Sequence, residues 1–330
     1  MAKLLRWAVV IAVAALLFIT GCAPPAEAPP QYSLRMGIIP TQSCLPYLVM
    51  KEKGLDKKYG LELITTEFPG GDPVIAAIVA GKLDLGIGGS ISVLAAAENG
   101  MIPGKIVPVA AINLVDAEHP FIGVVVSHSI NSWKDLEGKQ IAINAVNSPN
   151  MAGIKGRLQI EGIKDYRLPI LSFANMGLAV ADGTVDGATL VEPYLTQSLL
   201  RNDGKFLDWI VGGPPFEKMQ MTMLYFNGDI YRNNPQEVKA FLRAYVDALD
   251  WIAANKDESR LIIGKMMNLS NEVTQKMRLM NFSLDGRNNA ELLESMQPVL
   301  VRVGMLKAPI PANRLYDETL LNEVLRERNR

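Results

Sequence analysis

The sequence predicts an α/β protein built from two similar lobes with a cleft between them. Short apolar strands alternate with amphipathic helical stretches, an order typical of largely parallel sheets flanked by helices. A weak internal repeat indicates that this order occurs twice, because residues 80–86 (AGKLDLG) are echoed by residues 182–188 (DGTVDGA). The preceding strand ends match as well: Ile39 lies 45 residues before Asp84, and Ile143 lies 43 before Asp186. Two such lobes place a cleft at the carboxyl ends of their strands.

Strands and helix boundaries follow from apolar runs and from capping residues. Seven strands are predicted, over residues 34–39, 61–66, 84–88, 106–114, 121–126, 140–144 and 189–191. Helix starts combine a capping side chain with a following proline or helical run, at Asp72-Pro73, Ser90, Ser148-Pro149, Glu192-Pro193 and Asn234-Pro235. Gly81, Gly100 and Gly162 are expected to close helices. A helix over residues 235–255 has one apolar face, and the tail is expected to continue helical past Gly304 to a charge-rich end over residues 322–330.

The N-terminal sequence predicts an export signal. Lys3 and Arg6 precede thirteen apolar residues over 7–19, the length of a signal-peptide core, and the small pair Thr20-Gly21 is followed by Cys22. This pattern resembles a bacterial lipobox, in which the cysteine is acylated after cleavage. We therefore expect a signal peptide over 1–21, a lipid on Cys22, and a proline-rich spacer over 22–33 that holds the folded part off the membrane. The alternative is an ordinary secretory signal with an incidental cysteine.

Composition excludes several classes of function. The 33 Lys and Arg residues nearly balance the 34 Asp and Glu residues, so nothing suggests a nucleic-acid partner. Cys44 is the only cysteine besides Cys22, which leaves no intrachain disulfide once Cys22 is acylated. His119 and His128 lie far from Cys44 in sequence, no cluster has metal-ligand spacing, and no phosphate-binding Gly-Lys-Ser or Gly-Lys-Thr loop occurs. We expect no metal, no cofactor and no catalytic cysteine.

Several stretches together resemble the substrate-binding proteins of ABC importers. These are residues 80–86, 132–142 (SWKDLEGKQIA), 183–188 with Glu192-Pro193, and 234–241 (NPQEVKAF). They are similar to the nitrate, sulfonate, taurine and bicarbonate group, also described as pyrimidine-precursor-binding-like. The resemblance implies a type II periplasmic-binding-protein fold with a mixed, mostly parallel sheet in each lobe. Lobe I would comprise residues 34–120 plus 223–330, and lobe II residues 121–222, with two crossing segments as the hinge.

The same resemblance implies a function and its partners. A monomeric, non-enzymatic protein at the outer face of the cell membrane would capture a small molecule between its lobes and deliver it to a permease and its ATPase. Two alternatives stay open. Relatives of this fold make pyrimidine or quinone precursors, and a binding protein can also report its ligand to a membrane kinase.

The loops at the strand ends supply the predicted ligand contacts. These are Gln42, Ser43, Cys44, Asp72, Gly89, Ser90, Phe121, Asn147, Ser148, Asn150, Met176, Glu192 and Tyr194. None of these loops contains lysine or arginine, the residues that commonly offset the desolvation of a bound anion. The sequence therefore predicts a neutral, zwitterionic or amine-bearing ligand, with Asp72 or Glu192 accepting its donor group and Tyr47, Phe121 or Tyr194 supplying an apolar face.

Overall fold

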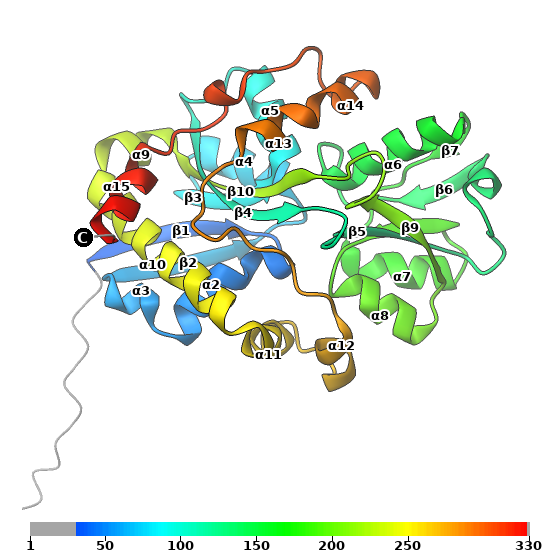
Figure 1. Cartoon of the computed structure of the whole chain (residues 1–330), viewed down its shortest axis with the longest axis horizontal. Coiled ribbons are helices and arrows are strands. Elements are labelled where there is room, and N and C mark those ends of the chain that lie inside the picture. The colour runs from blue at the N-terminus through cyan, green and yellow to red at the C-terminus, as the bar shows by residue number, and fades with distance from the viewer. Residues whose placement is uncertain (1–30, 329–330) are drawn as a thin grey trace, which may run out of the picture.

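The computed structural model describes residues 31–328. They form two α/β lobes side by side, joined by chain segments that cross between them (Figure 1). The predicted signal peptide, the acylated Cys22 and the spacer up to residue 30 lie outside the described residues. Within residues 31–328 no helix has the length and apolar content needed to cross a bilayer.

The first lobe is built on a five-stranded sheet with the order β2-β1-β3-β10-β4. Its strands are β1 (Tyr32–Ile38), β2 (Leu61–Glu67), β3 (Leu85–Gly89), β4 (Ile106–Val115) and β10 (Met219–Asn227). β1 is parallel to β2 and β3, whereas β10 runs antiparallel to β3 and β4. The four strands predicted here are present. β10 was not predicted, and it returns the chain to this sheet at Met219 rather than at residue 223.

The second lobe repeats this topology in the order β7-β6-β8-β5-β9. Its strands are β5 (Ile122–Val126), β6 (Lys139–Ala142), β7 (Tyr166–Arg167), β8 (Gly187–Leu190) and β9 (Lys205–Val211). Here β5 is the reversed strand, antiparallel to β8 and β9. In each sheet the reversed strand is thus the first one after the chain crosses between lobes. The expected pair of mixed, mostly parallel sheets is confirmed.

The internal repeat has a structural cause in both lobes. Asp84 precedes β3 and accepts a hydrogen bond from the backbone N–H of Arg35 on β1, at 2.8 Å. Asp186 precedes β8 and accepts one from the backbone N–H of Gln140 on β6, at 3.0 Å. Each aspartate therefore fixes the start of the central strand of its sheet, β3 or β8, against the neighbouring strand, β1 or β6.

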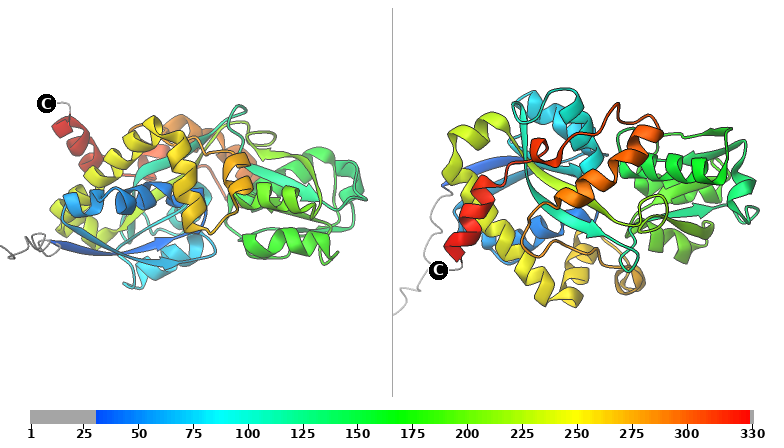
Figure 2. Two further views of the ribbon diagram at one scale, coloured as in Figure 1. Left: turned by 90° about the horizontal axis from the view of Figure 1, so that it is seen from below. Right: turned by 45° about the horizontal axis from the view of Figure 1, so that its top comes forward.

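Helices cover the faces of both sheets (Figures 1 and 2). The first lobe carries η1 (Gln42–Cys44), α2 (Leu45–Glu52), α3 (Leu55–Lys58), α4 (Gly71–Val79), α5 (Ser90–Glu98), α9 (Gly228–Asn233), α10 (Pro235–Ala254), α11 (Lys256–Met266) and α15 (Thr319–Arg328). The second carries η2 (Trp133–Leu136), α6 (Pro149–Glu161), α7 (Phe173–Ala181) and α8 (Tyr194–Arg201). The C-terminal helices α12 (Asn271–Lys276), α13 (Ala290–Ser295), α14 (Gln297–Arg302) and η3 (Ala312–Arg314) follow the return from lobe II.

The predicted helix starts at Ser148 and Asn234 are correct, and those at Asp72, Ser90 and Glu192 are displaced by one or two residues. Ser148 caps α6 by accepting a hydrogen bond from the backbone N–H of Met151, with Pro149 at the first helical position. α4, however, begins at Gly71 with Gly70 as its N-cap, so Asp72 lies inside the first turn and its carboxylate is free for another partner. The tail is not continuously helical. α14 ends at Arg302, and the prolines that follow Gly304 leave only η3 before α15.

Two segments cross between the lobes, over residues 116–121 and 212–218. They touch at Gly212, whose φ is +85° and whose added Cβ would lie 2.3 Å from Cα of Pro120. Only glycine combines this conformation with so close a neighbour. The backbone N–H of Phe121 also donates to the carbonyl of Val211 at 2.9 Å, so the segments are paired where they leave the second sheet.

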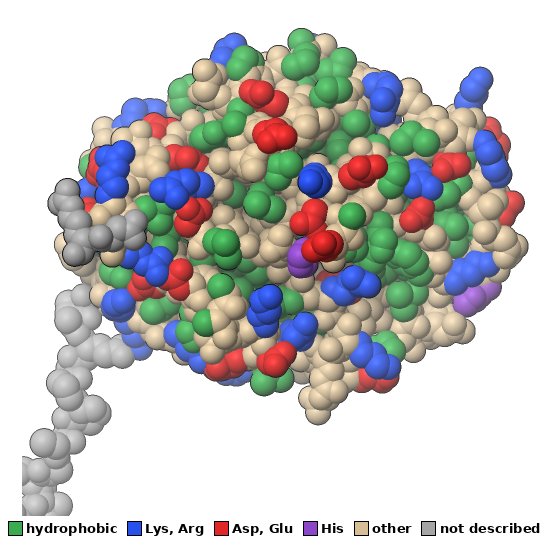
Figure 3. All heavy atoms as spheres, viewed as in Figure 1, with side chains coloured by type: hydrophobic (Ala, Val, Ile, Leu, Met, Phe, Trp, Pro, Cys, Tyr) green, Lys and Arg blue, Asp and Glu red, His purple; other side chains and the backbone are tan. Residues whose placement is uncertain are grey.

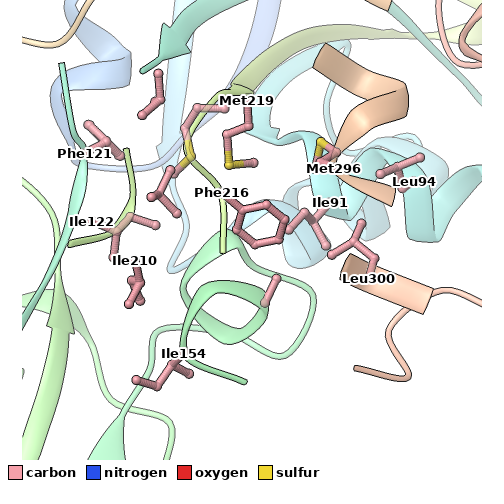
Figure 4. Packing of buried hydrophobic residues seen from close by; sticks show 14 of the residues in the cluster. Ile91, Leu94, Phe121, Ile122, Ile154, Ile210, Phe216, Met219, Met296 and Leu300 are labelled. Atoms are coloured by element: carbon pink, nitrogen blue, oxygen red, sulfur yellow. The ribbon is translucent and has the colours of Figure 1, made fainter. Parts of the chain in front are cut away.

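An apolar cluster runs continuously through this junction. Phe216, on the second crossing segment, lies between Ile91 and Met296 on one side and residues of the second lobe on the other (Figure 4). Ile154 and Ile210 continue the cluster into the second lobe. The two lobes therefore share one core beside the crossing segments, in addition to a separate core in each.

Candidate functional site: a cavity between the lobes

A cavity of about 50 Å³ lies between the lobes, at the carboxyl ends of strands from both sheets. A cavity needs roughly 10–15 Å³ of such space to hold one water molecule, so this cavity suits a small molecule, or part of one, with few heavy atoms. The first lobe lines it with Ile39, Thr41, Ser43, Gly70, Gly71, Gly89, Ser92, Met221 and Thr222. Phe121 on the crossing segment lines it together with Asn144, Asn147, Ser148, Pro149, Asn150, Phe173 and Val191 of the second lobe.

Three helices begin at the cavity wall. Gly70, Gly89 and Ser148 are the N-caps of α4, α5 and α6, and all three residues line the cavity. The first N–H groups of a helix have no partner inside the helix and carry partial positive charge. The wall therefore favours hydrogen-bond acceptor atoms on a bound molecule.

No lining residue, among those the structure describes, has an ionisable side chain. Charges are abundant outside, where basic and acidic side chains are interspersed over both lobes (Figure 3). The charge that contacts the wall is negative, because Asp72 accepts a hydrogen bond from Nδ2 of Asn147 at 3.0 Å. An ionised anion in this cavity would meet hydroxyls and helix starts but no cation.

Six of the predicted contacts lie on this wall: Ser43, Gly89, Phe121, Asn147, Ser148 and Asn150. Thr41, Gly70 and Gly71, in loops singled out by the sequence, lie there too. The other seven predicted residues, Gln42, Cys44, Asp72, Ser90, Met176, Glu192 and Tyr194, lie off the wall. Each is used by the fold in a different way.

Gln42 and Cys44 turn away from the cavity. The Gln42 amide donates to the carbonyl of Arg278 at 2.6 Å and accepts from the backbone N–H of Met280 at 2.7 Å, so it holds the C-terminal segment. The Cys44 thiol donates to the carbonyl of Ile39 at 2.8 Å. Burial raises the pKa of this thiol to about 12, so it is protonated at neutral pH.

Ser90, Met176 and Tyr194 lie behind the wall. Ser90 is fully buried with its hydroxyl 3.8 Å from Sδ of Met296, and Met176 belongs to the apolar core of the second lobe. Tyr194 stacks on Phe173, with ring centroids 5.7 Å apart, and its hydroxyl donates to the carbonyl of Pro40 at 3.0 Å. Tyr194 thus connects the lobes, and the aromatic side chains on the wall are the predicted Phe121 and, in addition, Phe173.

Glu192 does not face the cavity either. Its carboxylate accepts from the Thr196 hydroxyl at 2.8 Å and backbone N–H at 3.1 Å, and from the backbone N–H of Arg278 at 3.3 Å. Burial raises the pKa of Glu192 above its ordinary value of 4.5, against the opposing effect of these hydrogen bonds. Its partners are contacts within the protein, so the predicted role of accepting from a ligand is not supported by its position.

This raised pKa predicts a pH-dependent stability. The folded protein holds a proton on Glu192 at pH values where the unfolded chain has lost it, so the contribution to stability is complete below pH 4.5 and is lost as the pH rises through the raised pKa. Glu192→Gln, which stays uncharged, should therefore gain stability relative to wild type as the pH rises from 4.5 to 7. Melting temperatures of both proteins across this range test it. A difference that does not change with pH would contradict it.

Asp72 and Asn147 hold the two lobes together at the rim. Asp72 lies in the first turn of α4 and Asn147 lies in the second lobe, before α6. The backbone carbonyl of Asn147 also accepts from the Ser92 hydroxyl at 2.8 Å. Asn147 is therefore bound to the first lobe through two of its groups, and this contact can exist only when the lobes are closed.

We expect Asp72→Ala to weaken solute binding about fivefold. A hydrogen bond to a charged group contributes roughly 1.5–3 kcal/mol, and solvent exposure of this half-buried pair reduces that to about 1 kcal/mol. A double-mutant cycle with Asn147→Ala measures the coupling. If the losses of binding free energy in the two single variants add up in the double variant, Asp72 acts independently of Asn147, as it would if it contacted the ligand directly.

The sequence did not single out Asn144, Ser92, Phe173, Met221 or Thr222, which line the cavity. Asn144 could have been predicted from the sequence, because it is the polar residue that directly follows the apolar run Ile141-Ala142-Ile143, at the carboxyl end of a buried strand. Met221 and Thr222 lie on β10, which was not predicted and whose contribution to the cleft was therefore missed.

Two α/β lobes of like topology, two crossing segments and a cavity lined from both sides define the periplasmic-binding-protein architecture. The profile of the family described as NMT1/THI5 like matches residues 41–259. The chain belongs to this family.

Individual relatives differ in what their names describe. A Bacillus subtilis (strain 168) protein named as a candidate aliphatic sulfonates-binding protein is 23% identical over 331 residues, covering 96% of each chain. The Schizosaccharomyces pombe 4-amino-5-hydroxymethyl-2-methylpyrimidine phosphate synthase is 27% identical over 227 residues, 61% of this chain and 59% of its own. Among solved structures, the ligand-binding component of an ABC-type import system from Staphylococcus aureus superposes with a TM-score of 0.73 at 16% identity, covering 89% of this chain and 99% of its own.

Proposed function

We propose that this protein captures a small uncharged solute between its lobes, outside the cytoplasmic membrane, and delivers it to an ABC-type importer. The observation that carries the proposal is a cavity to which both lobes contribute and whose described lining residues are all uncharged. A solute in this position is contacted from both sides only in the closed form, so its binding energy favours closure. Of the ligand types that the sequence left open, the absence of a cation and of a carboxylate on the wall favours the neutral one.

The remaining parts of the proposal concern location and partners. The lipobox-like segment around Cys22 supports a lipid-anchored protein at the outer face of the membrane, and we propose that the protein is a monomer. The likeness to an ABC-type import component supports a permease and an ATPase as partners. A radiolabelled-palmitate experiment on wild type and Cys22→Ala tests the anchor, and loss of label in the variant is expected.

Native mass spectrometry of protein purified without refolding tests solute capture. We expect a bound small molecule that leaves on mild denaturation, and a smaller radius of gyration by small-angle X-ray scattering when it is returned. A protein that carries nothing, and whose radius of gyration is unchanged by an added metabolite extract, would contradict the proposal.

A second candidate follows from the relative named as a pyrimidine phosphate synthase, namely synthesis of a related precursor. The site gives it less support. The wall described here has no acid, base or thiol, and the nearby Cys44 thiol is protonated and hydrogen-bonded to Ile39. Recovery of a bound compound chemically unchanged after prolonged incubation is expected. Its conversion would favour the enzyme.

A further inference from the structure

One polar group on the cavity wall is left without a partner. Asn144 is 9% exposed, and its Oδ1 is buried and accepts no hydrogen bond within residues 31–328. Its Nδ2 faces the first lobe, 3.8 Å from the position that a Cβ on Gly70 would take. Asn144 thus stands where the two lobes meet, at the cavity itself.

The neighbouring asparagines show that this is unusual for the site. Asn150 donates through Nδ2 to the carbonyl and the hydroxyl of Thr189, at 3.0 and 3.1 Å, and Asn147 donates to Asp72. Both amides are used by the protein. Buried polar groups are nearly always hydrogen-bonded, and an exception on the wall of a binding cavity indicates a partner that arrives with the ligand.

The rest of the wall limits what that partner is. Phe121, Phe173 and Met221 supply apolar surface. The hydroxyls of Ser43 and Thr222 lie 3.3 Å apart, so one donates to the other and the second retains a free proton to donate. The helix starts at Gly71 and Ser90 offer further donors. A ligand that fits presents a donor to Oδ1 of Asn144 and acceptors to the hydroxyl and helix starts.

We propose that Asn144 is the specificity-determining residue of this cavity, pairing with an amide-like edge, a donor beside an acceptor, on an uncharged ligand. Primary carboxamides, ureas and aminopyrimidines have this edge. The side-chain amide of asparagine has the complementary edge, since it carries both a carbonyl oxygen and an NH₂ group. This inference rests on the proposed function and names the ligand class of the same cavity.

Matched pairs of probes test the assignment by isothermal titration on full-length protein freed of carried solute. Acetamide is compared with acetate and benzamide with benzoate, while cytosine and taurine complete the set. The members of a pair differ in the edge that Asn144 would contact and also in net charge, so the preference is assigned to Asn144 only through the variants below. We expect at least one of acetamide, benzamide and cytosine to bind, the amide of a pair to bind at least tenfold tighter than its carboxylate, and taurine to bind more weakly than either.

Two variants and a control then connect the preference to Asn144. Asn144→Leu keeps the size and removes the edge, and we expect at least tenfold weaker amide binding. Its melting temperature without ligand should not fall, because no hydrogen bond is lost. Asn144→Asp keeps the shape and loses the donor, and is expected to weaken amide binding comparably. Asn233→Leu, at an exposed position on α9, should bind as wild type.

Several results would overturn the assignment. Tighter binding of a carboxylate or of taurine would do so, as would equal affinities of wild type and Asn144→Leu, or no binding by acetamide, benzamide or cytosine. If taurine or a carboxylate binds and compacts the protein, the ligand class is wrong and the proposed capture of a solute stands. If no probe binds and native mass spectrometry shows no carried molecule, both proposals fail.

Discussion

Replacing Gly89 with leucine is expected to prevent closure and to weaken solute binding at least a hundredfold, about 2.7 kcal/mol. Gly89 belongs to the first lobe, and a Cβ there would lie 3.0 Å from Cδ of Pro149 in the second lobe. The proline ring is fixed at the start of α6 and has no rotamer by which to retreat. A leucine side chain therefore occupies space that the second lobe needs when the lobes close.

The same substitution should leave the first lobe intact. Gly89 has φ −63° and ψ 144°, a conformation open to any residue, so leucine is strained only by the neighbouring lobe. Gly104→Leu is the matched control, because nothing lies within 4 Å of a Cβ at that position. Native mass spectrometry measures retention of the carried solute, and small-angle scattering measures closure. Wild-type retention by Gly89→Leu would show that the lobes do not meet at Pro149 when solute binds.

Phe216→Ala is expected to destabilise the protein by about 3–5 kcal/mol. Phe216 is 2% exposed and lies in the apolar cluster that runs from α5 through the crossing segment to α6 (Figure 4). Removing its ring leaves a void that borders both lobes, so contacts on each side are lost together. Urea unfolding of the ligand-free protein measures the change.

A control separates this effect from a general loss of apolar side chains. Leu284 is 76% exposed, and Leu284→Ala should change the free energy of unfolding by no more than about 0.5 kcal/mol. A loss below 1 kcal/mol for Phe216→Ala would mean that the cluster does not hold the lobes together in solution.

The fold could be predicted because its signals are local. Alternation of apolar runs and capped helices located the strands, and the Asp84 and Asp186 repeat reported a contact made identically in both sheets. β7, β9 and β10 were missed, because β7 has only two residues and the apolar runs of β9 and β10 are interrupted by Asp208, Gln220 and Thr222. The antiparallel direction of β5 and β10 could not be predicted either. It depends on where the chain crosses between the lobes, and no residue pattern identifies the crossing points.

The site was predictable to the level of loops and less so for side chains. Parallel strands bring their carboxyl ends to one edge, so the loops holding Ser43, Gly89 and Ser148 meet at one cavity, as the sequence predicted. Which side chain of a loop faces the cavity depends on the opposite lobe. Gln42 binds a segment 236 residues away, and Asp72 meets Asn147 across the rim. Such contacts have no signature within their own stretch of sequence.

The position of Tyr32 bears on how the molecule would work on a tether. β1 begins there and ends at Ile38, just before the wall residue Ile39, so the strand enters the first lobe at the edge remote from the solute. A membrane anchor joined ahead of residue 31 would therefore be attached to the first lobe only, on the side opposite the cavity. The second lobe would then be able to move relative to the first. The open side of the cleft could face a membrane partner, because the N-terminal segment would not cross it.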